Sequence, residues 1–173
     1  IAPWNLPLYL LTWKIAPAIA TGNTCVCKPS EVTPVTAWML GSLVRQAGLP
    51  AGVVNIVHGT GQGAGAALVA HPDVPTVSFT GSTAVGRWIG ERAGAMLKRV
   101  SLELGGKNPF IVFDDADADA AADTAVRAAF TNQGQICLCG SRLLVQAGVY
   151  ERVLARVVAG AKAGYLGAEL QKT

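Results

Sequence analysis

Residues 76–86 read Thr76-Val77-Ser78-Phe79-Thr80-Gly81-Ser82-Thr83-Ala84-Val85-Gly86, and this stretch decides the fold. The β-branched and aromatic residues at 76–79 predict a strand, and Gly81-Ser82-Thr83 predicts the start of a helix that ends near Leu97. A strand that passes through a glycine turn directly into a helix is the repeating unit of α/β proteins. In such a protein the same unit should recur on both sides of this stretch.

The unit does recur along the chain. After a proline-containing loop over 1–9, helices are expected over 10–20, over 33–46, from the glycine-rich loop to about residue 70, over 116–130 and over 149–163. Strands are expected over 24–28, 53–57, 99–104, 110–113 and 142–146. This alternation predicts an α/β fold with a parallel sheet.

The composition argues against several classes of protein. The chain has 173 residues, is 51% hydrophobic and carries a formal net charge of only +3, so no nucleic-acid partner is expected. No apolar run approaches the roughly 18 residues of a membrane-spanning helix, so no membrane partner is expected either. The four cysteines form two C-x-C pairs, which suit neither a disulfide scaffold nor the usual spacing of a zinc site. We expect a reducing, cytoplasmic location and no metal.

Two glycine-containing loops could hold a phosphate group. Gly59-Thr60-Gly61-Gln62-Gly63-Ala64-Gly65 contains the pattern G-x-G-x-x-A between a strand and a helix, but the next strand lacks the acid that a dinucleotide fingerprint requires. A glycine turn that lets strand and helix pack closely explains this loop equally well. In the second loop, Ser82 could bind an anion through its hydroxyl or could simply cap the helix.

Two acidic residues stand out. Glu31 follows Lys28 at the end of a strand, where the pair could hold a ribose or could form only an exposed ion pair. Glu103 lies inside the apolar strand 99–104. A carboxylate there is either a paired structural acid or a general base, and burial would raise its pKa toward the range of a base. The two histidines are isolated in loops, and no role is expected for them.

The loop Asn132-Gln133-Gly134-Gln135-Ile136-Cys137-Leu138-Cys139-Gly140-Ser141-Arg142 holds the second cysteine pair. A structural cysteine usually lies in an apolar run, where it packs as a small hydrophobic residue. Here amides and glycines flank the pair, and loops on a rigid scaffold often carry reactive groups. The thiolate is the nucleophilic form of cysteine. From the flanking residues alone, a catalytic role and a structural role are equally supported.

Five motifs in register resemble those of the aldehyde dehydrogenase superfamily. They are Trp4-Asn5, Lys28-Pro29-Ser30-Glu31, Phe79-Thr80-Gly81-Ser82 with Gly86, Leu102-Glu103-Leu104-Gly105-Gly106-Lys107, and Gly134-Gln135-Ile136-Cys137. The stretches 11–17 and 137–139 are most similar to the branch that acts on 2-aminomuconic and 2-hydroxymuconic semialdehydes. The resemblance spans the whole chain. It implies a Rossmann-like portion of a cofactor-binding domain over residues 1–104, followed by the start of an α/β catalytic domain over 105–173.

The resemblance also implies a reaction. Cys137 would attack the aldehyde carbon to give a thiohemiacetal, and Asn5 with the backbone N–H of Cys137 would form the oxyanion hole. Hydride would pass to the nicotinamide of NAD and leave a thioester. Glu103 would then activate the water that hydrolyses this thioester to the carboxylic acid.

The same resemblance implies a set of cofactor-binding residues. Lys28 and Glu31 would hold the adenosine ribose, and Ser82 with Trp4 would contact the pyrophosphate. Gly61 would pass near the adenine, whereas Thr80 and the backbone near Leu104 would lie by the nicotinamide. The full set is Trp4, Lys28, Glu31, Gly61, Thr80, Gly81, Ser82, Gly86 and Leu104. Because the Glu31 carboxylate would repel a 2′-phosphate, NAD is expected rather than NADP.

The chain has only part of the length of family members, and it does not begin with Met. We therefore expect a fragment that is inactive by itself, from a parent enzyme that acts on a small aldehyde and forms a homo-oligomer. Two other interpretations stay open. One is a CoA-acylating semialdehyde dehydrogenase, although such relatives lack a base at the position of Glu103. The other is a non-catalytic fragment or binding module.

Overall fold

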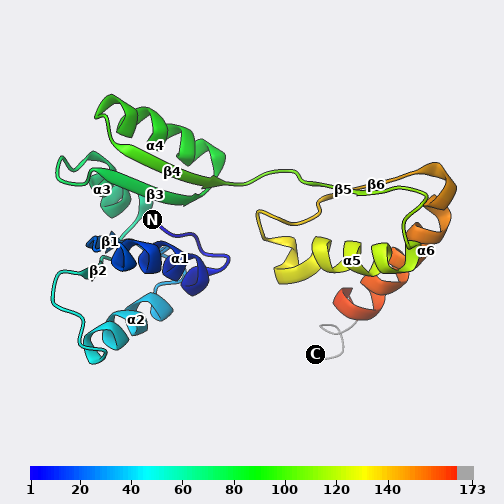
Figure 1. Ribbon diagram of the computed structural model, residues 1–173, viewed down its shortest axis with the longest axis horizontal. Helices are drawn as coiled ribbons and strands as arrows, with labels where there is room; N and C mark the ends of the chain where they lie inside the picture. Colours follow the sequence, from blue (N-terminus) through cyan, green and yellow to red (C-terminus); the bar gives the residue numbers. More distant parts are fainter. Residues whose placement is uncertain (167–173) are drawn as a thin grey trace. The chain divides into compact units, whose positions relative to one another are not determined.

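The computed structural model describes residues 1–166. The chain divides into two compact units, Ile1–Leu104 and Gly105–Thr173 (Figure 1). Helices alternate with strands in each unit, and the described strands pair in parallel. The predicted α/β class is therefore confirmed.

The first unit is built on two pairs of parallel strands, β1 with β2 and β3 with β4. One core cluster packs α1 and α2 around β1 and β2, with Leu11 and Ile15 at its centre. A second cluster packs Val69 of α3 and Ile89 of α4 against Phe79 of β3. The elements are α1 (Pro7–Ala20), β1 (Cys25–Cys27), α2 (Val35–Gln46), β2 (Val54–Ile56), η1 (Gly61–Gly65), α3 (Ala66–Ala70), β3 (Thr76–Gly81), α4 (Thr83–Ala95) and β4 (Arg99–Leu104).

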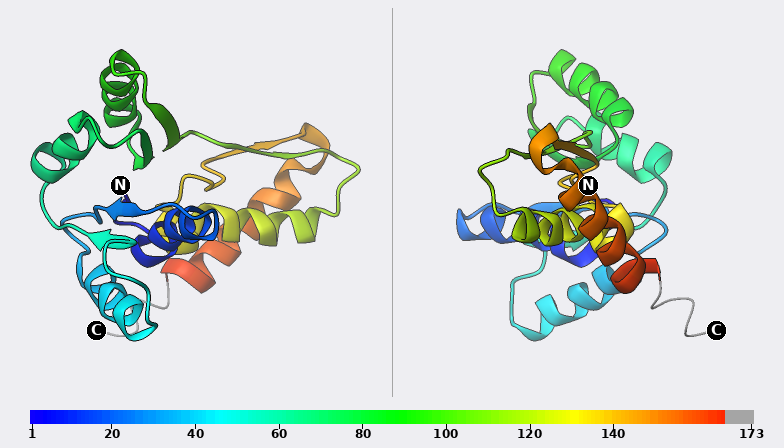
Figure 2. Two further views of the ribbon diagram at one scale, coloured as in Figure 1. Left: turned by 60° about the vertical axis from the view of Figure 1, so that its left-hand side comes forward. Right: turned by 90° about the vertical axis from the view of Figure 1, so that its right-hand side faces the viewer.

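The second unit is built on the parallel pair β5 and β6, and α5 and α6 lie together on one side of that pair (Figure 2). Val112 of β5, Ala122 of α5 and Val153 of α6 form the buried centre. The Asp117 carboxylate caps α5 by accepting from the backbone N–H of Asp119 at 3.0 Å, as expected for acids at a helix N-terminus. The elements are β5 (Pro109–Val112), α5 (Ala118–Phe130), η2 (Thr131–Gly134), β6 (Arg142–Val145), η3 (Ala147–Val149), α6 (Tyr150–Ala161) and η4 (Lys162–Leu166).

Most boundaries lie within one or two residues of the sequence prediction, and three differences have a clear local cause. Gly61–Gly65 was expected to be a loop, but it forms a π-helix that leads directly into α3, with the Thr60 hydroxyl accepting from Gly63 N–H at 3.0 Å. Glycines permit this wide turn because they have no side chains to crowd it. β3 extends to Gly81 because Thr80 and Gly81 continue the register with β4. α1 begins at Pro7, where proline is favoured in the first helical turn.

Gly86 allows α4 to pack closely on β4. A Cβ built at Gly86 would lie 2.4 Å from Leu104 Cδ2, so Gly86→Val should overpack this contact and lower the free energy of unfolding by about 1–3 kcal/mol. Urea unfolding of the complete protein would measure the change. Gly94→Ala on the same helix is the control, because nothing lies within 4 Å of the added Cβ and helix propensity should raise stability by about 0.5–1 kcal/mol. Equal losses in both variants would contradict the packing role.

Candidate active site

The pair β3 and β4 carries polar side chains on one face. Thr80 pairs with Glu103 and Ser78 pairs with Ser101, and paired residues of neighbouring strands point to the same face of a sheet. Lys14 of α1 lies on this face, where its ammonium donates to Ser78 Oγ at 3.0 Å. Thr80 and Glu103 lie near the carboxyl ends of their strands. Ligands of open α/β sheets bind at that edge.

The position of Glu103 corrects one expectation. Its side chain was expected to be buried in an apolar strand, but it is exposed in this structure. The strand alternates strictly, so Ser101 and Glu103 lie on the polar face while Leu102 and Leu104 pack into the core. Burial lowers the pKa of Lys14, and the negative charge of Glu103 partly opposes that shift.

The first residues of the chain tie two strand ends together. The backbone nitrogen of Ile1 donates to Ser78 O at 2.8 Å, and Thr80 N–H donates to Ile1 O at 3.2 Å. Ala2 N–H donates to Lys28 O at 3.0 Å. Trp4 and Asn5 come two and three residues after Ala2, and each residue of extended chain spans only about 3.5 Å. These two predicted residues are therefore brought to the edge that carries Lys28 and Thr80.

Lys28 and Glu31 form an ion pair of unequal exposure. The Lys28 side chain is 3% exposed, the Glu31 side chain is 48% exposed, and Nζ lies 2.8 Å from Oε2. The hydrogen bond from Lys28 lowers the pKa of Glu31 to about 2, with help from the backbone N–H groups of Glu31 and Gly61. The pair is therefore not an ion pair between two exposed side chains. The buried Lys28 ammonium holds the Glu31 carboxylate in place at the surface. Gly61 lies against this carboxylate.

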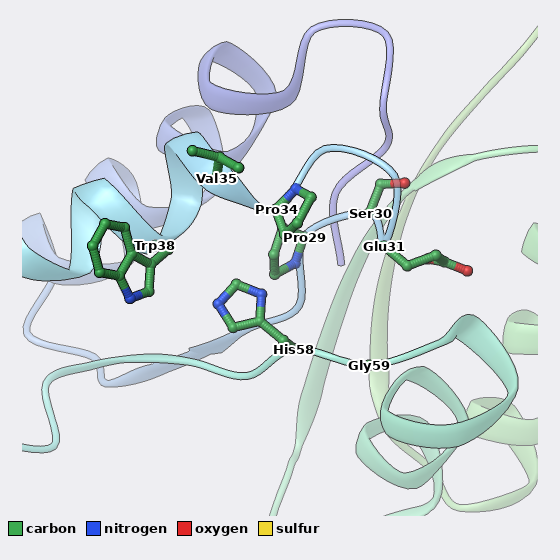
Figure 3. A pocket seen from close by; sticks show the side chains of 8 residues that line it. All are labelled: Pro29, Ser30, Glu31, Pro34, Val35, Trp38, His58 and Gly59. Carbon is green, nitrogen blue, oxygen red and sulfur yellow. The ribbon is translucent and has the colours of Figure 1, made fainter.

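An open cavity of about 550 Å³ adjoins this carboxylate (Figure 3). Figure 3 shows the Trp38 indole and the His58 imidazole on one side of the two prolines and the Glu31 carboxylate on the other. The lining residues are Pro29, Ser30, Glu31, Pro34, Val35, Trp38, His58 and Gly59. The walls are mostly apolar, and the ionised oxygens lie at one end.

The loop between β3 and α4 has the predicted helix cap. Ser82 Oγ accepts from Val85 N–H at 3.3 Å, so the capping interpretation is confirmed. Gly81 leaves room for the Phe79 ring, because a Cβ at Gly81 would lie 2.4 Å from Phe79 Cζ. The N-terminus of this 13-residue helix opens beside Thr80 and Gly81, and the amide groups of a helix N-terminus favour anions.

Cys137 lies at the tip of a turn in the second unit. Cys139 N–H donates to Ile136 O at 3.0 Å, which places Cys137 and Leu138 at the two central positions. Cys137 is exposed, whereas Cys139 is buried. Just before the turn, three successive residues at 132–134 have left-handed φ angles of 52°, 56° and 72°. At the two non-glycine positions, Asn132 and Gln133, this conformation is strained, and strained backbone is concentrated at functional sites.

The described part of the chain contains no group of three or more His, Cys, Asp or Glu side chains that could hold a metal ion. In the same part, no helix has both the length and the apolar character needed to cross a membrane.

A family model described as "Aldehyde dehydrogenase family" matches residues 1–173. The chain belongs to the aldehyde dehydrogenase family. It is 64% identical over 158 residues to 2-aminomuconic semialdehyde dehydrogenase of Danio rerio, and the aligned region covers 91% of this chain and 32% of that protein. It is 53% identical over 172 residues to phenylacetaldehyde dehydrogenase of Pseudomonas fluorescens, and here the aligned region covers 99% of this chain and 34% of that protein. This aldehyde dehydrogenase chain thus spans about a third of the length of these relatives.

Solved structures agree with the family assignment and confirm the fold. An aldehyde dehydrogenase from Brucella melitensis biovar abortus 2308 has a TM-score of 0.91 at 48% identity, over 93% of this chain and 33% of that one. An indole-3-acetaldehyde dehydrogenase in complex with NAD⁺ also has a TM-score of 0.91 at 48% identity, again over 93% of this chain and 33% of that one.

The predicted site residues fall into both units. The first unit contains Asn5, Glu103 and every predicted cofactor-binding residue, and the second contains Cys137. Within the first unit, the structure brings Trp4, Asn5, Lys28, Thr80 and Glu103 to one edge of the strands. The roles of these residues stay predictions.

Sequence reasoning missed several residues in and around the candidate site. Trp38 and His58 line the cavity, although no role was assigned to either. His58 comes two residues after the end of β2, and that position was the available signal because strand ends carry ligands in α/β folds. Lys14 was noted only as part of the stretch 11–17. The available signal was its isolation in an otherwise apolar helix, because a charged side chain there needs a polar partner.

Proposed function

We propose that the protein carrying this chain oxidises an aldehyde to the carboxylic acid, with NAD as hydride acceptor. The observation that carries the proposal is the exposed Cys137 thiol at the tip of a hydrogen-bonded turn, in a chain that belongs to the aldehyde dehydrogenase family over its whole length. We propose a muconic-type semialdehyde as the substrate class, because relatives at 64% and 58% identity are named 2-aminomuconic semialdehyde dehydrogenases.

Cys137 forms and breaks the covalent bond in the proposed reaction. Its thiolate sulfur adds to the aldehyde carbon, the carbonyl π electrons move to oxygen, and a thiohemiacetal forms. The amide of Asn5 and the backbone N–H of Cys137 donate to this oxygen, where negative charge develops. When bound, NAD supplies the acceptor for the hydride that leaves the carbon, and the substrate stays on Cys137 as a thioester.

Glu103 completes the cycle as the general base. Its carboxylate takes a proton from water while the water oxygen attacks the thioester carbon. The C–S bond breaks, the thiolate of Cys137 is restored, and the acid leaves. An exposed carboxylate at the carboxyl end of β4 supports this role, because a base that activates water must be accessible to water.

The first unit suits NAD in three respects. The apolar walls at Pro29, Val35 and Trp38 suit a flat heteroaromatic ring, and the Glu31 carboxylate at the end of the cavity can accept from two ribose hydroxyls. The Thr80 hydroxyl oxygen is buried and has no hydrogen-bond partner among the described residues, so it has capacity to bond a ligand. The related indole-3-acetaldehyde dehydrogenase was solved with NAD⁺.

Replacing Glu31 by alanine should narrow the preference for NAD over NADP. The carboxylate accepts from the ribose 2′- and 3′-hydroxyls and repels a 2′-phosphate, while Lys28 partly offsets that repulsion. Because the pKa of Glu31 is lowered to about 2, its carboxylate stays ionised as the pH is lowered toward the ordinary value of 4.5. A change in preference over this range should therefore follow the 2′-phosphate of NADP, whose second pKa is about 6. The measurement is kcat/KM for both cofactors across that range. A wild-type preference for NADP would contradict the role of Glu31.

Product analysis tests the proposed function directly. The complete protein is incubated with a panel of aldehydes that includes a 2-aminomuconic-type semialdehyde and phenylacetaldehyde, with NAD and with or without CoA. We expect NADH and carboxylic acid in equal amounts, whether or not CoA is present. Acyl-CoA as the main product would support the CoA-acylating alternative, and a lack of NADH with every aldehyde would overturn the proposal.

A further inference from the structure

Asn108 is held by its backbone at the start of the strand pair β5 and β6. Its carbonyl oxygen accepts from Arg142 N–H at 3.1 Å, next to the paired residues Pro109 and Arg142. The Arg142 guanidinium also donates to Lys107 O. These bonds do not use the side chain of Asn108, which is half-buried and turned toward the Cys137 turn.

The Asn108 side-chain amide bridges two carbonyl groups of that turn. Nδ2 donates to Cys137 O at 2.6 Å and to Cys139 O at 3.1 Å. A primary amide has two N–H donors on one nitrogen, and a backbone carbonyl can only accept. The nitrogen must therefore face the turn. One planar group thus ties down the carbonyls on both sides of Leu138.

The base of the turn is packed, but its tip is not. Gly140 N–H donates to Ala128 O at 3.0 Å, and a Cβ at Gly140 would lie 3.3 Å from Phe110 Cβ, so the chain passes close to the core here. At the tip, Cys137 is exposed and Leu138 is 82% exposed. Burial of side chains does little to fix the tip. Its conformation depends on backbone hydrogen bonds and on the bridge from Asn108.

We propose that Asn108 is a positioning residue, whose two hydrogen bonds fix the backbone of Cys137 and thereby the direction of its thiol. The inference rests on the proposed function, in which Cys137 is the nucleophile. Holding the Cys137 carbonyl fixes the ψ angle of that residue, and the bond from Cys139 N–H to Ile136 O closes the turn on the other side. Misplacement of a nucleophile by about 1 Å can cost roughly a hundredfold in rate, so a loose tip should slow the chemical step.

Two variants of the complete protein separate hydrogen bonding from packing. Asn108→Ala removes both donors and the side-chain volume, whereas Asn108→Asp keeps the shape but presents carboxylate oxygens to two carbonyls. The control is Asn55→Ala on β2, because Asn55 Nδ2 also donates to two backbone carbonyls, Cys25 O at 3.3 Å and Gly52 O at 2.8 Å. It removes the same kind of bridge at a place with no assigned role.

Rapid-mixing kinetics measure the effect on chemistry. With NAD and aldehyde saturating, the rate of the first NADH turnover should fall by about a hundredfold in both Asn108 variants, while Kd for NAD stays unchanged. The Asn55 variant should keep the wild-type rate even if its Tm falls. Hydrogen exchange followed by mass spectrometry should show faster exchange of backbone amides at 136–139 in the Asn108 variants only.

Several outcomes would overturn the inference. A wild-type first-turnover rate in Asn108→Asp would show that shape, and not hydrogen-bond donation, is what matters. Wild-type rates in both variants with a lowered Tm would make the role of Asn108 purely structural, as would failure of both variants to fold. Failure of the proposed function looks different: the wild-type protein itself would form no NADH, and the exchange data would still report whether Asn108 holds the turn.

Discussion

Replacing Cys137 by alanine should abolish aldehyde oxidation by the complete protein, with a loss in kcat on the order of 10⁴-fold or more. No other group can form the thiohemiacetal at that position, because the substitution removes the sulfur that carries the substrate. Cofactor binding should be nearly intact, since the predicted NAD-binding residues lie in the first unit. NADH formation measures the activity, and quenching of tryptophan fluorescence by NAD measures binding.

Cys139→Ala is the matched control for this prediction. Cys139 lies two residues away and is buried, with its sulfur 4.0 Å from Thr131 O. Its loss should leave only a small cavity and lower stability by about 1 kcal/mol, with little effect on turnover. If the Cys139 variant were inactive and the Cys137 variant active, the assignment of the nucleophile would be wrong.

Glu103→Gln should slow hydrolysis of the thioester by about 10²–10⁴-fold, which is the usual contribution of a general base. Hydride transfer precedes the step in which Glu103 acts, so it should change much less. Mixing the variant with NAD and aldehyde should therefore give a rapid burst of NADH followed by slow turnover. Rapid-mixing absorbance of NADH resolves the two phases.

Glu91→Gln on α4 serves as the control for Glu103, because Glu91 is also an exposed carboxylate of the first unit. This variant should behave as the wild type in both phases. If Glu103→Gln slowed the burst and the steady state equally, Glu103 would be a structural acid rather than the base.

The alternation of strands and helices could be predicted from sequence because each element carries a local signal. The β-branched and aromatic residues at 76–79 and the Ser82 cap are such signals, and the structure contains both the strand and the cap. The π-helix Gly61–Gly65 has no such signal, since a run of glycines is typical of a turn and has no side-chain period. It is specified by its neighbours, the Thr60 cap before it and α3 after it.

The site was only partly predictable for a different reason. Glu103 was expected to be buried because its strand is apolar overall, although the alternation of polar and apolar residues at 99–104 already places it on the polar face. Lys28 and Glu31 could be paired from their spacing, but the burial of Lys28 involves distant residues such as Gly65, where an added Cβ would lie 3.9 Å from Lys28 Cδ. The contact between Asn108 and Cys137 joins residues 29 positions apart, so no local pattern reveals it.

The cysteines show what the structure adds to sequence. The residues that flank Cys137 supported a catalytic role and a structural role equally. All four thiols are free, but burial raises the pKa of Cys27 to about 12, which keeps it protonated and unreactive. Cys139 is buried and Cys25 is half-buried, so Cys137 is the one exposed thiol among the described residues. Exposure therefore favours Cys137 as the nucleophile, as the family motif also does.

Trapping the acyl-enzyme tests the central claim most directly. The complete Glu103→Gln protein is mixed with NAD and an aldehyde, quenched in acid during the slow phase, digested and analysed by mass spectrometry. Fragmentation of the peptide that contains Cys137 and Cys139 should place the added mass on Cys137, and this mass should equal the aldehyde minus two hydrogens, as a thioester requires. An acyl group on Cys25, Cys27 or Cys139, or a burst of NADH with no acylated cysteine, would contradict the account.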